Sequence, residues 1–150
     1  MDSPCISYVI HIAATREELW EALTSPRALE ANWGKIRSAW TVGAEVSEVS
    51  KSGDVLWRGE VLRSDAPGLL SYTFDVTGSG EPASEVTFAI DAPASKVASG
   101  VAVSRLTLTH SGFGDNSKLF SGCARAWPEI LSSVKSYLET GRPLPFVWNH

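Results

Sequence analysis

The sequence predicts one α+β domain, in which a long helix covers one face of an antiparallel sheet. Its 150 residues fit the usual size of a single domain, about 100 to 200 residues. Strand-type alternation of apolar and polar side chains runs almost without interruption from Ile36 to His110. One long amphipathic pattern follows this region, and a strand with two short helical patterns precedes it. A sheet with one apolar face needs a cover, and the last helix is the only predicted element large enough to provide it.

The first elements are a strand and two short helices. Residues 5–12 form the strand, because their apolar side chains recur at a period of two: Ile6, Tyr8, Ile10 and Ile12. Thr15, followed three residues later by Glu18, is a capping box that starts the first helix. Ser25 and Pro26 suit the N-cap and the first position of a second short helix.

About six strands are expected between residues 36 and 110, as a meander joined by turns. Apolar and polar side chains alternate in 44–50, 55–63, 70–75, 85–91 and 102–110. Turn-forming residues occupy 51–54 and 65–68, and a flexible loop is expected over 92–100. Gly59 falls on the apolar face of its strand, where it either lets the sheet bend or lets another group approach closely.

The last element is a long amphipathic helix over residues 116–140. Its apolar residues recur at intervals of three and four: Leu119, Phe120, Cys123, Trp127, Ile130, Leu131, Val134 and Leu138. Either Asp115 or Asn116 can cap its start, and Gly141 with Pro143 stops it. Pro128 lacks the N–H of an interior helical residue, so we expect a kink near residues 124–127.

Composition and charge exclude several classes of partner. The chain has 13 Lys and Arg against 17 Asp and Glu, and its basic residues are scattered, so no nucleic-acid footprint is expected. No apolar run approaches the roughly 18 residues of a membrane span, and the first residues show no signal-peptide pattern. Cys5 and Cys123 lie far apart, and the His residues show no metal-ligand spacing. We therefore expect a cytoplasmic protein with reduced cysteines, no membrane insertion, no metal and no cofactor.

The order of these elements and a set of short motifs resemble a known superfamily. The motifs include Leu19-Trp20-Glu21-Ala22-Leu23-Thr24-Ser25-Pro26, Gly59-Glu60-Val61-Leu62, Leu70-Ser71-Tyr72-Thr73-Phe74 and Trp127-Pro128-Glu129-Ile130-Leu131. Residues 5–144 resemble the START-like, birch-pollen-allergen-like (SRPBCC) superfamily with its helix-grip fold. Within it they look most similar to homologues of the C-terminal domain of the heat-shock-protein-90 ATPase activator. The resemblance implies that a small apolar molecule binds between sheet and long helix; a minority of members catalyse cyclisation or hydrolysis there.

Ten side chains are expected to line a ligand site between the sheet and the long helix. Alternation in the strands and spacing in the helix select Trp57, Tyr72, Phe74, Phe88, Leu106, Leu108, His110, Phe120, Cys123 and Trp127. Rings this large are difficult to interdigitate without leaving a hollow, although a packed core is the alternative for each of them. Trp57 and Trp127 would face each other as walls, whereas Trp20 and Trp33 belong to the short helices that plug one end.

Among titratable side chains, this alternation places only His110 on an inward face, with Glu60, Asp75 and Glu85 outward. An inward His110 can orient a ligand or act as an acid or base near neutral pH. The alternative is a histidine hydrogen-bonded at a strand end. The sequence has no nucleophile elbow, no zinc-protease motif and no phosphate loop. No catalytic residue is therefore assigned, and an enzymatic role would rest on His110.

The last six residues, 145–150, form an apolar tail with two large aromatic side chains, Phe146 and Trp148. The tail either folds back on its own domain or pairs with a second subunit, which would make a homodimer. The sequence thus predicts a binding protein for a small apolar or aromatic ligand. A cyclase- or hydrolase-like enzyme using the same cavity and a co-chaperone-type interaction module are the two alternatives.

Overall fold

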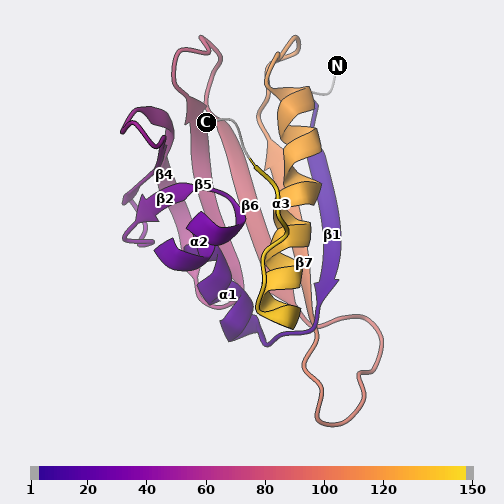
Figure 1. The fold of residues 1–150 in the computed structure, drawn as a ribbon. Coiled ribbons are helices and arrows are strands. Elements are labelled where there is room, and N and C mark those ends of the chain that lie inside the picture. Colours follow the sequence, from indigo (N-terminus) through magenta and orange to yellow (C-terminus); the bar gives the residue numbers. More distant parts are fainter. Residues whose placement is uncertain (1–3, 148–150) are drawn as a thin grey trace.

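A curved antiparallel sheet of seven strands, covered on one face by three helices, makes up residues 4–147, the part of the chain that the computed structural model describes (Figure 1). The strands are β1 (Ile6–Ile12), β2 (Lys35–Ser38), β3 (Glu45–Val49), β4 (Val55–Asp65), β5 (Leu69–Val76), β6 (Ser84–Asp91) and β7 (Ser104–Ser111). The helices are α1 (Arg16–Thr24), α2 (Pro26–Asn32) and α3 (Phe120–Thr140). The spatial order β1-β7-β6-β5-β4-β3-β2 pairs the first strand with the last, and all other neighbours are consecutive.

This architecture confirms the predicted α+β class and the order of its elements. Helices α1 and α2 lie over one end of the sheet, and α3 runs in front of β7 beside β1 (Figure 1). The capping box is formed: the Thr15 side chain accepts a hydrogen bond from the Glu18 N–H, and Glu18 Oε1 accepts one from the Thr15 N–H. Among the described residues, no helix is long and apolar enough to cross a membrane.

Alternation along the strands decides which side chains face the helices. In β7, Ser104, Leu106, Leu108 and His110 are buried, and the residues between them are half-buried. On the opposite face of the sheet, Glu60, Asp75 and Glu85 are exposed, as the sequence predicts. The inward side chains of the strands join those of α1, α2 and α3 in one hydrophobic core.

Gly59 is the point of closest approach between β4 and β5. A side-chain carbon on this residue would overlap the carbonyl oxygen of Thr73 and lie 2.6 Å from its carbonyl carbon. The Thr73 hydroxyl accepts a hydrogen bond of 2.8 Å from the Glu60 N–H beside it. Of the two predicted reasons for this glycine, close approach is confirmed, and the approaching group is the neighbouring strand.

The start of α3 differs from the prediction. The helix begins at Phe120 rather than residue 116, and the expected cap at Asp115 or Asn116 is wrong. Instead, Ser117 Oγ accepts hydrogen bonds from the N–H groups of Leu119 and Phe120, at 3.1 and 3.2 Å. Glu81, on the loop between β5 and β6, accepts from the Ser117 hydroxyl at 2.5 Å and from the Lys118 N–H at 2.9 Å. A carboxylate from a distant loop thus holds the start of α3, where negative charge is favourable.

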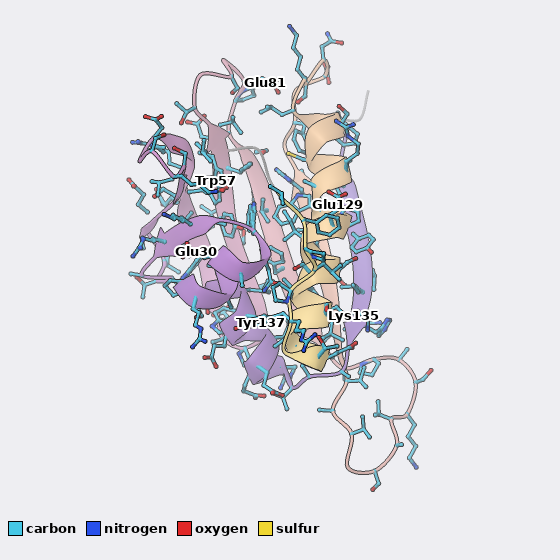
Figure 2. The ribbon with its side chains drawn as sticks, in the orientation of Figure 1. Glu30, Trp57, Glu81, Glu129, Lys135 and Tyr137 are labelled. Atoms are coloured by element: carbon cyan, nitrogen blue, oxygen red, sulfur yellow. The ribbon has the colours of Figure 1, made fainter. Side chains whose placement is uncertain are left out.

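Glu81→Gln should loosen the start of α3 and lower the free energy of unfolding by about 1–2 kcal/mol. The amide keeps one acceptor oxygen, but its NH2 group would face a donor. Hydrogen exchange of the amides of residues 118–123 should accelerate more than exchange in the rest of α3. Glu129→Gln is the matched control, because Glu129 is exposed on α3 and its carboxylate makes no hydrogen bond or ion pair within residues 4–147 (Figure 2). Equal exchange in both variants would show that Glu81 does not hold the helix.

The segment after α3 folds back on the domain. Gly141 ends the helix in the left-handed conformation, with φ of 82°, as predicted for the stop signal. The Leu144 N–H then donates to Ser133 Oγ at 3.0 Å, and the Ser133 hydroxyl donates to the buried Asn32 amide oxygen at 2.8 Å. The chain up to Leu144 therefore packs against α3 and α2. Phe146 is 40% exposed, and residues 148–150, including Trp148, lie outside the described residues.

Candidate functional site

The interior between the sheet and α3 is filled by aromatic rings that contact one another. Trp57 stacks on Tyr72 with ring centroids 5.8 Å apart and meets Phe74 edge-on at 4.7 Å. Phe88 meets Trp127 edge-on at 5.7 Å. Such offset and edge-to-face contacts are the favourable geometries for aromatic pairs. The large inward rings thus pack directly against one another.

All ten residues predicted to line a ligand site belong to this interior. Seven of them are buried side chains of β4 to β7 or of the middle of α3: Trp57, Tyr72, Phe88, Leu106, Leu108, His110 and Trp127. Phe74, Phe120 and Cys123 are half-buried and pack against the same core. The structure brings the ten side chains together, and their role in binding a ligand stays a prediction.

The Trp33 ring has contacts that its predicted place among the short helices does not reveal. Trp33 is the residue that follows α2, and the prediction assigns it to the plug formed by the short helices. Its ring also contacts both expected walls, stacked on Trp57 at 5.7 Å and edge-on to Trp127 at 4.9 Å. A third indole therefore contacts both of the expected walls.

His110 is the centre of a buried chain of hydrogen bonds, called the His110 relay below. The Trp127 Nε1–H donates to His110 Nδ1 at 3.0 Å, and His110 Nε2 lies 2.7 Å from the Ser84 hydroxyl. An indole N–H can only donate, so Nδ1 accepts and the ring proton of the neutral imidazole resides on Nε2. Ser84 in turn donates to the carbonyl oxygen of Phe74 at 3.3 Å. The relay ties α3 to β5, β6 and β7 in the middle of the core.

The environment of His110 keeps its ring neutral. The side chain is 0% exposed, and burial lowers its pKa from 6.5 to about 4. Protonation would also place an N–H on Nδ1, directly opposite the N–H of Trp127. Because both ring nitrogens are engaged, the geometry fits the alternative of a structural histidine and offers no free nitrogen for acid–base work.

Glu48 is an inward titratable residue that the sequence reasoning missed. It is 3% exposed on β3, and its Oε1 accepts a hydrogen bond of 2.8 Å from Trp57 Nε1. Glu48 lies two residues beyond Val46 in an alternating strand, so the parity that marks Val46 as inward already marks Glu48. Burial first, and the carboxylate of Glu48 second, raise the pKa of Tyr72 above its ordinary range. The aromatic interior therefore contains one buried carboxyl group as well as the imidazole.

Cys123 borders this interior at the first turns of α3. Burial, and to a smaller extent the charge of Glu81, raise the pKa of its thiol to about 11. The thiol is therefore protonated at neutral pH and suits an apolar wall better than a nucleophile. Cys5 and Cys123 are both free.

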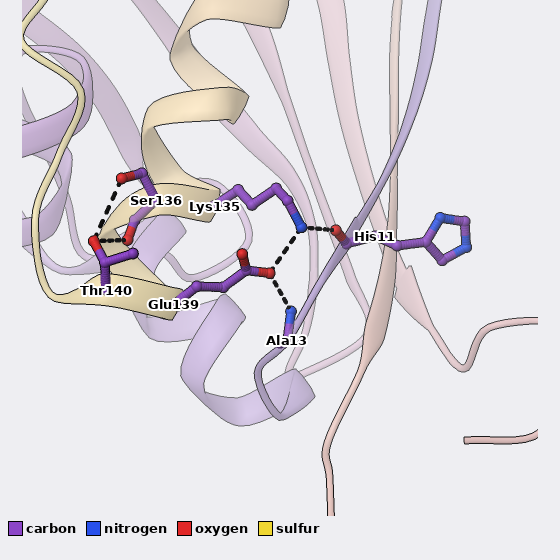
Figure 3. Close-up of polar contacts among 6 residues, drawn as sticks. All are labelled: His11, Ala13, Lys135, Ser136, Glu139 and Thr140. Atoms are coloured by element: carbon purple, nitrogen blue, oxygen red, sulfur yellow. Dashed lines mark hydrogen bonds and ion pairs between the residues drawn. The ribbon is translucent and has the colours of Figure 1, made fainter. Parts of the chain in front are cut away.

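A polar clasp holds the C-terminal half of α3 against the sheet (Figure 3). The Lys135 ammonium donates to the carbonyl oxygen of His11 and to Glu139, both at 2.7 Å. Glu139 also accepts from the Ala13 N–H at 2.7 Å, and this bond, followed by the one to Lys135, lowers the Glu139 pKa. With the His110 relay and the Glu81 contacts, α3 is fastened near its start, its middle and its end.

A surface cavity lies outside the aromatic interior. It has a volume of about 380 Å³ and lies between the start of α1 and the loop joining β6 to β7. Its lining is partly charged and partly apolar: Arg16 and Asp91 lie beside small apolar side chains from the segment 92–103. None of the ten predicted site residues lines it. No group of three or more His, Cys, Asp or Glu side chains in residues 4–147 is placed to hold a metal ion.

The curved sheet, the two short helices after its first strand and the long covering helix define a helix-grip domain of the START-like class. The chain belongs to the family described as Activator of Hsp90 ATPase homolog 1-like protein, whose family model matches residues 13–139. This membership confirms the predicted branch of the superfamily. No curated protein sequence matches the chain.

Solved structures share the fold over nearly the whole chain. Protein MLL2253 from Mesorhizobium loti is 25% identical, with a TM-score of 0.76 over 91% of this chain and 97% of its own. The Aha1 dimer from Colwellia psychrerythraea is 22% identical, with a TM-score of 0.72 over 92% and 98%. DynU16, from the dynemicin biosynthetic locus, is 23% identical with a TM-score of 0.77; the match covers 97% of this chain and 51% of DynU16. At these identities the last two establish the fold alone.

Proposed function

We propose that the protein binds a small apolar or aromatic molecule between the sheet and α3. The observation that carries the proposal is the concentration of aromatic side chains on the inward faces of β4 to β7 and α3. An ordinary core is filled mainly by aliphatic groups, whereas mostly apolar surfaces with a few fixed polar groups are typical of ligand sites. Family membership supports the same region, since related helix-grip proteins bind ligands there.

The proposed walls are Trp57, Tyr72, Phe88 and Trp127, and two polar groups keep them in position. Glu48 accepts from the Trp57 indole, and His110 accepts from the Trp127 indole. We assign His110 a positioning role through Trp127, because its own nitrogens are already bonded to Trp127 and Ser84. Phe120 and Cys123 would border the same site from the first turns of α3.

Titration with a panel of fatty acids, sterols and polyphenols tests this proposal, with the emission of the protein's tryptophans as the signal. We expect a saturable change for at least one class of ligand. Phe88→Leu should weaken that binding by roughly tenfold, because it removes one aromatic contact. Val9→Ala, on the outer face of β1 and 50% exposed, should leave the affinity unchanged. Flat titrations throughout the panel would refute the binding function.

A second candidate is activation of a chaperone ATPase, which the family's description favours. It predicts that the protein stimulates ATP hydrolysis by a purified Hsp90 chaperone, whether or not the ligand titrations respond. A homodimer also stays a proposal, supported by the dimeric Aha1 from Colwellia psychrerythraea that shares the fold. A molar mass from light scattering that matches the 16.1 kDa chain would refute the dimer.

A further inference from the structure

Trp33 differs from its neighbouring rings in how it is held. Its backbone is fixed, because the N–H groups of Trp33 and Gly34 both donate to the carbonyl oxygen of Leu29, at 2.8 and 2.9 Å. Within residues 4–147 the ring makes no side-chain hydrogen bond, whereas the indoles of Trp57 and Trp127 are bonded to Glu48 and His110. Trp33 is also only half-buried, while Trp57 and Trp127 are each 3% exposed. The Trp33 ring is therefore the least constrained of the three indoles.

The contacts of the Trp33 ring are those a planar aromatic guest would make. One face stacks on Trp57, with centroids 5.7 Å apart and planes 19° from parallel. Its second aromatic neighbour is Trp127, at 4.9 Å and 66°. One stacking wall and one edge-on wall are a favourable setting for a flat ring system. A sterol or an acyl chain would gain less from these walls, because it presents no π-face.

We propose that Trp33 is a built-in plug that occupies the position of the ligand, and that the ligand is a planar aromatic molecule of indole size or larger. This inference rests on the proposed binding function and specifies its ligand and its control. Binding requires that the Trp33 ring leave the space between Trp57 and Trp127. The protein is therefore self-occluded, and its apparent affinity is reduced by the small fraction of molecules in which the plug is out.

Removal of the plug should tighten binding of a planar aromatic probe. For 1-aminoanthracene, followed by its own fluorescence, the dissociation constant of Trp33→Ala should be at least about tenfold lower than that of the unmodified protein. Trp33→Leu fills part of the space and should fall between the two. Trp20→Ala is the matched control: Trp20 is half-buried on α1 and stacks on no other aromatic ring within residues 4–147. Circular dichroism checks that each variant is folded.

The outcomes separate the plug from the binding function. Equal affinities in the unmodified protein and in both Trp33 variants would overturn the plug and leave the binding function intact. No binding by any of them would overturn both. A decrease in affinity on removing Trp33 would show that this ring is a wall of the site, which also overturns the plug.

A measurement on the full chain guards against a variant that fails to fold. Labelling with 5-fluorotryptophan gives one 19F resonance for each of the six tryptophans, and Trp33→Phe assigns one of them. On saturation with 1-aminoanthracene, the Trp33 resonance should move to a solvent-exposed position with a larger H2O/D2O isotope shift. The resonances of Trp57 and Trp127 should shift while remaining protected from solvent. A Trp33 resonance that stays protected at saturation would overturn the plug.

Discussion

Gly59→Ala should lower the free energy of unfolding by about 3 kcal/mol or more, the largest effect expected from a single methyl group in this protein. The added carbon would overlap the Thr73 carbonyl, which belongs to the backbone of β5 and cannot rotate away. Relief requires β4 and β5 to separate beside the walls Trp57 and Tyr72. Urea unfolding followed by circular dichroism measures the change, as a lower midpoint at an unchanged slope.

Gly122→Ala is the control for that substitution. Gly122 lies in α3 with nothing within 4 Å of an added side-chain carbon. Alanine favours the helical conformation there, so the same methyl group should stabilise the protein by about 0.5–1 kcal/mol. Opposite signs for the two substitutions would establish that the approach of β5 requires Gly59. A loss below about 1 kcal/mol for Gly59→Ala would contradict the close approach.

Acidification from pH 6.5 to 4 should cost the folded protein about 3 kcal/mol through His110 alone. Burial lowers the His110 pKa from 6.5 to about 4. Between these values the unfolded chain binds a proton that the folded chain refuses, so stability falls as the pH falls. The contribution of neutral His110 to stability is fully present above pH 6.5 and is lost progressively as the pH falls from 6.5 to about 4. The carboxyl groups of Glu18, Asp91 and Glu139 also have lowered pKa values. Their contributions to stability are therefore lost mainly below the ordinary pKa of 4.5 for Glu or 3.8 for Asp.

Urea unfolding at several pH values between 7 and 4.5 measures this effect. His110→Gln cannot titrate, so its stability should be lower at pH 7 but nearly constant across the same range. His11→Gln is the matched control: His11 is exposed on β1, and its replacement should leave the pH dependence of the unmodified protein in place. If the slope persisted in His110→Gln, a group other than His110 would be its source.

The fold could be predicted because its signals are local. The capping box at Thr15, the left-handed stop at Gly141 and the alternation of β7 each depend on residues a few positions apart. The start of α3 was mispredicted because the serine that caps it, Ser117, is itself held by Glu81, which is 36 positions away in the chain. Near Asp115 and Asn116, the local pattern contains no sign of that carboxylate.

The composition of the interior was predictable from strand parity, but the contacts within it were not. Parity places Trp57, Tyr72 and His110 inward, and applied to β3 it also predicts the inward position of Glu48. It cannot show that His110 receives the indole N–H of Trp127, because that bond joins a strand to a helix. In the structure His110 links the strand to the helix, and its part in binding a ligand stays a prediction.

The sequence by itself determined the class of fold, the elements and the side chains that face the interior, since these follow from local periodicity and capping. Only the tertiary structure decided how the interior is filled. The ring of Trp33 meets Trp57 and Trp127 because the end of α2 is held against α3 through Asn32 and Ser133, a placement that depends on packing between distant segments. Local patterns state which way a side chain points, whereas the partner it meets depends on how all the elements pack together.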